Sequence, residues 1–140
     1  MHAHRMHRLA ATLLACTWFS SCGGGDWPAE AVTFSVRLKG LPASEEFRVS
    51  STSPQFIAQA RTQLLLPVSE RRLFVAGSLG SGSGGDNPGW SWHLQGAVLT
   101  ESAIALCDGR PSMVQANLNY WVNTVKSLCP WTSYIHAEVP

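Results

Sequence analysis

The side chains of this chain that could carry out chemistry are concentrated in the segment NPGWSWHL, Asn87 to Leu94. Two tryptophans, a serine and a histidine alternate there, directly after the run GSGSGGDNP. Histidine changes its charge near neutral pH, so His93 is a candidate for acid–base chemistry. Together with Asp108, and with Ser91 as a further member, it could form an acid–base or metal-binding cluster. Such a cluster would make the protein a hydrolase or a metal-assisted enzyme.

The same alternation also fits a strand without catalysis. In an extended strand, Trp90 and Trp92 point to one face, and Ser91 and His93 point to the other. Tryptophans on one face are typical of a core in which each indole N–H seeks an acceptor. The chain contains no nucleophile elbow, no H-x-x-x-H pattern and no second histidine at a useful spacing. The sequence therefore favours a non-catalytic role and predicts no metal site.

Residues 80–85 read GSGSGG and match a G-x-G-x-x-G string. The string precedes a tryptophan-rich strand, so it lacks the helix N-terminus that would face a pyrophosphate. Its composition is that of a flexible linker. Asp86 and Asn87 lack the repeated acidic ligands of a calcium loop, so no cofactor is predicted. A rigid, extended loop at this place could instead enter a protease active site, which leaves a protease-inhibitor-like module as an alternative.

The first 21 residues are typical of an export signal. A basic start with Arg5 and Arg8 precedes a mostly apolar stretch, Leu9 to Phe19. That stretch is shorter than the roughly 20 residues that a membrane-spanning helix needs. The following FSSC and GGG resemble a bacterial lipoprotein signal, in which the cysteine is lipidated and becomes the mature N-terminus. We therefore predict lipidation at Cys22, and Gly23 after it favours the outer membrane.

Other interpretations of this segment stay open. Cys16 also fits a lipoprotein box, although it would leave a shorter apolar core and place Trp18 just beyond the cleavage point. An ordinary secretory signal cut near Ser21, which would release a secreted protein, is a further alternative. On the preferred interpretation, residues 1–21 are the signal peptide, 22–31 a flexible tether and 32–140 a single domain.

Charge narrows the choice of partner. Two of the ten Lys and Arg lie in the signal, which leaves eight against nine Asp and Glu, a net charge of about −1. No basic stripe is present, so nucleic acid and acidic lipid surfaces are poor partners. After the signal no apolar run is long enough to span a bilayer, so only the lipid would hold the protein to a membrane. An envelope or extracellular protein, or a small ligand, is the expected partner.

Two cysteines, Cys107 and Cys129, remain besides the lipidation candidates Cys16 and Cys22. Export places them in an oxidising compartment, where a pair is expected to form a disulfide. A metal site is disfavoured because His or Cys partners at finger-like spacing are absent nearby. In the chain-entropy model, a disulfide that closes a loop of this length stabilises the fold by about 3 kcal/mol.

Periodicity predicts an α+β domain, in which two helices pack on a mainly antiparallel sheet of about five or six strands. Ser53 and Pro54 form a helix-start signal, and Pro67 closes that helix. Pro111 opens a second helix, whose apolar stripe runs from Val114 to Leu128. Alternation predicts strands at 32–38, from 47, at 73–79, 90–94, 97–100 and 133–139, with 102–107 as a strand or a brief helix.

Three spaced segments carry a family resemblance: NPGWSWHL, ALCDGRPSMVQANLNYW and CPWTSYIHAEV. They resemble the amino-terminal domain family of the calmodulin-binding protein BP-seventy-four, and the resemblance runs from about Phe47 to Val139. It implies a small, often secreted domain with its two cysteines bonded, and no established catalytic activity. Calmodulin is not an expected partner, because neither predicted helix is basic and amphipathic.

The sequence as a whole predicts a disulfide-containing lipoprotein domain of the cell envelope that acts as a binding module. The expected contact surface comprises residues 80–93, Asp108 and the CPW segment. Its candidate binding residues are Asn87, Trp90, Ser91, His93, Asp108 and Trp131. The enzyme alternative requires that His93 and Asp108 reach a common point, which a structure can test.

Overall fold

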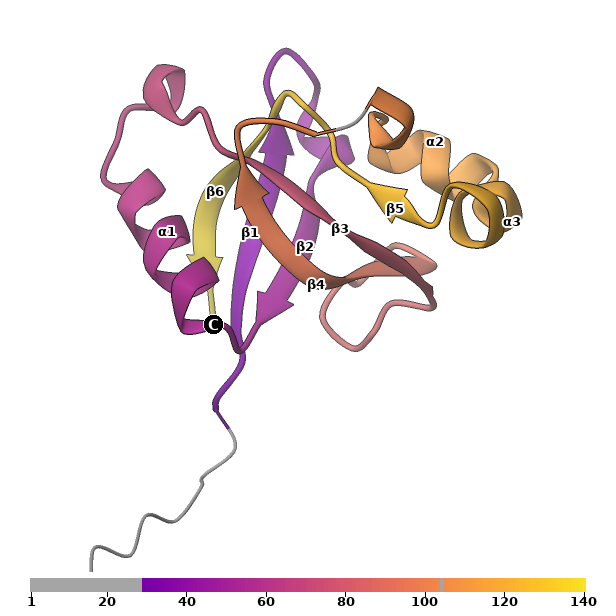
Figure 1. The fold of residues 1–140 in the computed structure, drawn as a ribbon, viewed down its shortest axis with the longest axis horizontal. Coiled ribbons are helices and arrows are strands. Elements are labelled where there is room, and N and C mark those ends of the chain that lie inside the picture. The colour runs from indigo at the N-terminus through magenta and orange to yellow at the C-terminus, as the bar shows by residue number, and fades with distance from the viewer. Residues whose placement is uncertain (1–28, 104) are drawn as a thin grey trace, which may run out of the picture.

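The computed structural model describes residues 29–103 and 105–140. In this part of the chain, six strands form two three-stranded antiparallel sheets, with helical segments beside them (Figure 1). The α+β class, the antiparallel pairing and the Cys107–Cys129 disulfide are confirmed, and the strands are divided between two sheets. The signal peptide, Cys22 and most of the predicted tether lie outside the described residues.

The first sheet has the order β2-β1-β6. It consists of β1 (Val32–Leu38), β2 (Phe47–Ser51) and β6 (Ser133–Val139). The predicted strands at 32–38 and from 47 pair as a hairpin, and their connection contains the 3₁₀ turn η1 (Ala43–Glu45). Apolar alternation places side chains of β1 and β2 in the core, as period two requires.

The second sheet has the order β4-β3-β5, with β3 (Phe74–Ser81), β4 (Trp92–Thr100) and β5 (Ser127–Leu128). The sequence predicted separate strands at 90–94 and 97–100. Instead β4 runs through residues 95 and 96, where Gly96 and Ala97 together face Gly77 and form a bulge. Gly96 has φ +59°, a left-handed conformation that glycine adopts without the steric cost of a Cβ atom.

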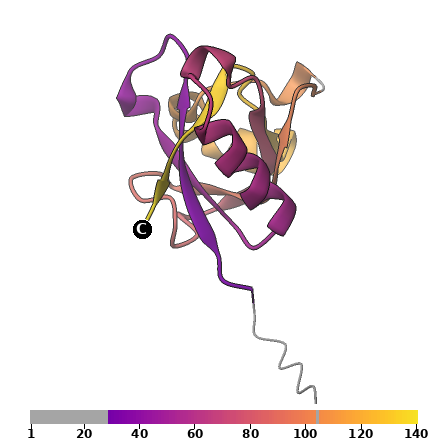
Figure 2. The same cartoon turned by 90° about the vertical axis from the view of Figure 1, so that its left-hand side faces the viewer.

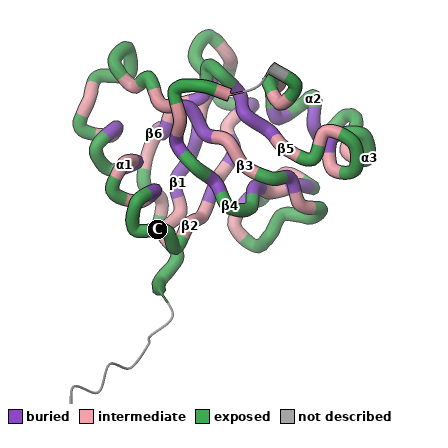
Figure 3. Tube along the Cα trace, viewed as in Figure 1, coloured by how far each residue is buried: buried purple, intermediate pink, exposed green. Residues whose placement is uncertain are grey.

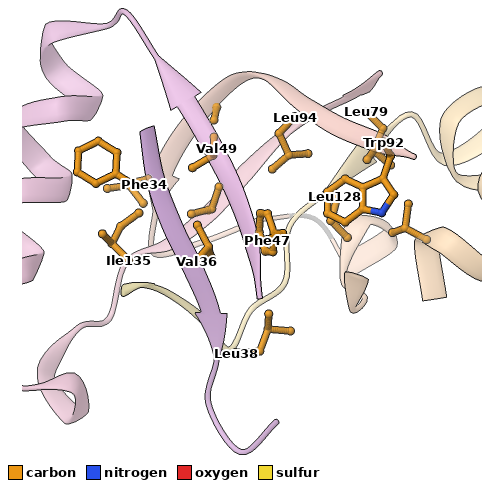
Figure 4. Packing of buried hydrophobic residues seen from close by; sticks show 14 of the residues in the cluster. Phe34, Val36, Leu38, Phe47, Val49, Leu79, Trp92, Leu94, Leu128 and Ile135 are labelled. Atoms are coloured by element: carbon orange, nitrogen blue, oxygen red, sulfur yellow. The ribbon is translucent and has the colours of Figure 1, made fainter. Parts of the chain in front are cut away.

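A shared core joins the two sheets (Figure 4). Phe47 of β2 lies against Trp92 of β4, with ring centroids 5.4 Å apart. The buried Ser133 Oγ of β6 accepts a hydrogen bond from the Val75 N–H of β3 at 3.1 Å. One apolar cluster therefore extends through both sheets.

The helix α1 (Pro54–Leu64) begins as the sequence predicts, with Ser53 Oγ accepting the Phe56 N–H at 3.3 Å. It lies beside β6 (Figure 2), and its buried Phe56 packs edge-on against Phe34 of β1. After the turn η2 (Val68–Glu70), the Arg71 guanidinium donates to the carbonyls of Leu66 and Ile135 at 2.9 Å each. Arg71 thus satisfies a carbonyl beyond the helix end and ties that end to β6.

The second predicted helix is shorter and less regular than expected, and its predicted end at Leu128 is wrong. The segment comprises α2 (Pro111–Ala116), the single turn α3 (Leu118–Tyr120) and the π-turn η4 (Trp121–Val125). Lys126 then adopts φ 67°, and Leu128 lies in β5, opposite Gly77 of β3. A buried leucine at helical spacing can equally come from a strand that enters the same core, so periodicity could not separate the two.

Residues 105–107 form the 3₁₀ turn η3 (Ala105–Cys107), the brief helix that the sequence left open against a strand. In the described residues, no helix has the length and apolar character that crossing a membrane requires.

Candidate functional site

The disulfide joins η3 to the residue after β5, and the Cys129 N–H donates to the Cys107 carbonyl at 2.7 Å. Beside it, the Asp108 carboxylate accepts the backbone N–H of Trp131 at 3.0 Å. The CDG and CPW segments therefore lie side by side. Gly109 is required there, because a Cβ atom would lie 2.6 Å from the Trp121 ring.

Asn87 is completely buried and bonds with both ends of its amide. Its Oδ1 accepts the Arg48 N–H at 2.8 Å, and its Nδ2 donates to the Trp92 carbonyl at 2.9 Å. Asn87 thereby holds the glycine-rich loop against β2 and the start of β4. Its side chain can affect a binding surface only by positioning the backbone around it.

The two tryptophans of the motif also have roles in the fold. The half-buried Trp90 donates its indole N–H to the Glu46 carbonyl at 2.9 Å, and its ring packs on Trp92. Trp92 is completely buried, and within the described residues its indole N–H has no hydrogen-bond partner. Trp92 and Leu94 lie in the core, which is the face that strand alternation predicts for them.

His93 is half-buried, and glycines of the glycine-rich loop lie against its ring. Its Nδ1 lies 2.9 Å from the Gly82 carbonyl, and its Nε2 lies 3.1 Å from the Gln95 amide nitrogen. Because a carbonyl only accepts, the hydrogen-bond network places the proton on Nδ1 and leaves Nε2 to accept from Gln95. A Cβ atom at Gly80 or Gly84 would lie 2.5 Å or 2.6 Å from the imidazole ring.

The prediction of a flexible linker at residues 80–85 is therefore wrong. The loop folds through turns, with positive φ at Gly82, Gly84 and Gly85, and closes on the His93 ring. Glycine here allows a close approach to the ring and a left-handed backbone. A glycine-rich segment that serves these purposes has the same composition as a flexible linker, so the sequence could not separate the two. The loop is compact, so it does not have the extended form that entry into a protease active site requires.

Ser91 is exposed and is tied to α2 by Gln115. The Ser91 N–H donates to Gln115 Oε1 at 2.8 Å, and Gln115 Nε2 donates to Ser91 Oγ at 3.1 Å. The Ser91 hydroxyl has no hydrogen bond to His93 in the described residues, so the geometry does not show an activated serine.

His93 and Asp108 are not joined in the structure. Each bonds to a different partner, and among the described residues no hydrogen bond connects them. Nor does that part of the chain contain a group of three or more His, Cys, Asp or Glu side chains that could hold a metal ion. In the described residues, His93 and Asp108 therefore do not form a hydrogen-bonded acid–base pair.

A surface that sequence reasoning missed lies beside the disulfide. Leu106, Met113 and Tyr120 are large apolar side chains that are 83%, 46% and 49% exposed. With Asp108 they line an open groove of about 570 Å³, whose other walls are Ala116, Asn117, Trp121 and Val125. Figure 3 shows this helical segment as largely exposed at one end of the fold. Large apolar residues off the predicted buried stripe, such as Met113 and Tyr120, were the available signal.

The comparison with protein families gives one match, to the family described as the BP-seventy-four N-terminal domain, over residues 30–140. The matched range contains all three motif segments and nearly all of the described residues. No curated protein and no solved structure matches the chain.

Proposed function

Since the chain belongs to the BP-seventy-four N-terminal domain family, whose members its three motifs resemble, we propose that it is a non-catalytic binding module of the cell envelope. The observation that carries the proposal is the apolar groove beside the disulfide, lined by Leu106, Met113 and Tyr120. Contiguous exposed apolar surface on a small domain marks a site of interaction. The partner chemistry that fits is an apolar segment of another envelope or extracellular protein.

Hydrogen bonds, ring packing and the disulfide hold the segments that line the groove. The buried Glu45 carboxylate accepts the backbone N–H of Ser112 at 2.9 Å and its hydroxyl at 2.5 Å, which holds the start of α2 in place. Trp121 fills the floor against Gly109, and the disulfide holds η3 beside it. A preorganised surface loses little conformational entropy on binding, which favours recognition of a defined partner.

Of the binding residues predicted from sequence, those at the disulfide end of the molecule have the main role in recognition. Asp108 lines the groove, and Trp131 is bonded to it and 47% exposed. Asn87, Trp90 and His93 are engaged within the fold, and Ser91 bonds to α2. These four do not line the groove, and in this proposal they act through the fold.

Anchoring at Cys22 remains a proposal, and it suits the position of the groove. Thr132 and Ser133 lie beside Lys39 and Leu38, at the end of β1 opposite Val32 (Figure 1). A strand of this length spans roughly 20 Å, so the CPW segment lies about that far from the tether. A lipid on Cys22 would hold the start of β1 near the membrane and present the disulfide end away from it, toward other proteins.

Site-specific crosslinking tests the proposal. A photoreactive amino acid is placed at Met113 or Tyr120 in the full chain, in cells, and at Arg61 as a control away from the groove. We expect one discrete crosslinked protein from the two groove positions and none from the control. Leu106→Asp should remove that product and leave the melting temperature unchanged, because Leu106 is an exposed side chain.

The result that would overturn the proposal is equally specific. If the crosslinks at the groove match those at Arg61, or survive Leu106→Asp, the groove is not the binding surface. Membrane fractionation of wild type and Cys22→Ala checks the anchor separately, since loss of the lipid should release the protein from the membrane.

A further inference from the structure

A second hollow, of about 350 Å³, is linked to the apolar groove through the hydrogen bond between Asp108 and Trp131. It is lined by Arg72, Phe74, Glu101, Ser102, Ala103 and Trp131. We infer that this hollow binds a neutral saccharide, with the sugar ring against the Trp131 indole and hydroxyl groups bridging Arg72 and Glu101. The inference is independent of the apolar groove, because the two hollows share no lining residue.

The charged side chains of the hollow are available to a ligand. Arg72 and Glu101 are exposed, and among the described residues neither takes part in an ion pair or a hydrogen bond. They line one hollow with opposite charges and do not form a salt bridge with each other. A group that both donates and accepts could bond to the carboxylate and to the guanidinium at once.

The aromatic side chain is also available. Trp131 is 47% exposed, whereas the Phe74 ring of the same hollow is almost completely buried. An exposed indole offers an apolar face with a polar tip, the combination that recognises ligands with one apolar and one hydroxylated side. A pyranose ring has such faces: its C–H groups cover one side, and its hydroxyls project from the rim.

Hydrogen bonds hold the backbone on two sides of the hollow, so the chain segments that carry Trp131 and Glu101 are fixed. Trp131 lies two residues after the disulfide-bonded Cys129, and its backbone N–H donates to the Asp108 carboxylate. On the other wall, Thr100 Oγ1 donates to the Ser102 carbonyl at 2.9 Å and accepts the Ser102 N–H at 3.2 Å. Both walls are therefore fixed independently of any ligand, which lowers the entropic cost of binding.

The paired opposite charges select for a neutral ligand. An anion would be attracted by Arg72 and repelled by Glu101, and a cation would meet the reverse. A zwitterion such as a free dipeptide could satisfy both, but desolvating its ammonium and carboxylate costs more than desolvating hydroxyls. Neutral hydroxyl groups match both charges at the lower cost.

The test uses the purified full chain and an array of neutral oligosaccharides, namely tetramers of N-acetylglucosamine, glucose and galactose. The tetramer that binds is then titrated by calorimetry, beside the dipeptide Ala-Ala. We expect one tetramer to bind in the micromolar to millimolar range typical of a small open site, and Ala-Ala to show no heat. Trp131→Ala and Glu101→Gln should each weaken that binding at least ten-fold.

Matched controls separate this site from the fold and from the groove. Met113 lines the groove and not the hollow, so Met113→Ala should bind the tetramer as wild type does. Glu101→Gln changes an exposed carboxylate, so an unchanged melting temperature shows that its effect is on the ligand. Absence of binding by every tetramer, binding of Ala-Ala in their place, or tetramer binding unaffected by Trp131→Ala would each overturn the inference.

Discussion

The tryptophan strand and the disulfide end are both rich in motif residues, but they use them in opposite ways. At residues 80–94 most of the motif side chains are engaged within the fold: Asn87 bonds to two backbone groups, and glycines lie against the His93 ring. At the disulfide end, a covalent bond and Asp108 hold the backbone, and large side chains such as Leu106 and Trp131 stay exposed. The difference shows that an unusual motif can mark a constraint of the fold as readily as a site.

Of the changes that compare the two regions, removing the disulfide should have the largest effect on stability. The double variant Cys107→Ser/Cys129→Ser reopens a loop with a sequence separation of 22. We expect a loss of about 3 kcal/mol in the free energy of unfolding, measured by urea denaturation at neutral pH. Reducing agent should destabilise wild type by a similar amount and leave the double variant unchanged, and a response of the double variant would contradict this account.

Asn87→Ala should give the next largest effect, although it removes only one polar side chain. The Arg48 N–H and the Trp92 carbonyl would lose their buried partner, at a cost of about 2 kcal/mol. Ser91→Ala in the same segment is the control, because Ser91 is exposed and should change stability by less than about 0.5 kcal/mol. Equal effects of the two substitutions would mean that the buried hydrogen bonds of Asn87 do not stabilise the segment.

Substitution of two adjacent glycines separates backbone strain from the contact with His93. Gly84 and Gly85 both have positive φ, so alanine at either should cost about 1 kcal/mol. A Cβ atom at Gly84 also meets the His93 ring, whereas at Gly85 nothing lies within 4 Å. Gly84→Ala should therefore lower the melting temperature more than Gly85→Ala, and a reversed order would show that the loop does not close on His93.

The smallest effect should come from an ion pair outside both regions. The Arg61 guanidinium hydrogen-bonds the Glu138 carboxylate at 2.8 and 3.0 Å and lowers the pKa of Glu138. Because that pKa is lowered on folding, the stabilisation is present above the unfolded pKa and is lost as pH falls through the folded pKa. Glu138→Gln should lower the melting temperature slightly at neutral pH, and the difference from wild type should vanish in acid.

Local sequence signals predicted much of the fold but little of the candidate site. Apolar alternation located β1, β2, β3 and β6, and Ser53–Pro54 located the start of α1, because each signal acts within a few residues. The end of the second helix was missed, since Leu128 satisfies the same core from a strand that pairs with Gly77. The groove was missed because exposure of Met113 and Tyr120 depends on what packs around α2 and α3.

The sequence by itself determined the α+β class, the disulfide and the family, because composition, period and motif order are properties of the chain. Only the tertiary structure decided that glycines lie against the His93 ring, that Asp108 bonds to Trp131, and that apolar side chains remain exposed beside them. The physical reason is that exposure and hydrogen bonding depend on residues distant in sequence. Asn87 and Arg48 meet across 39 positions, a contact that no local pattern encodes.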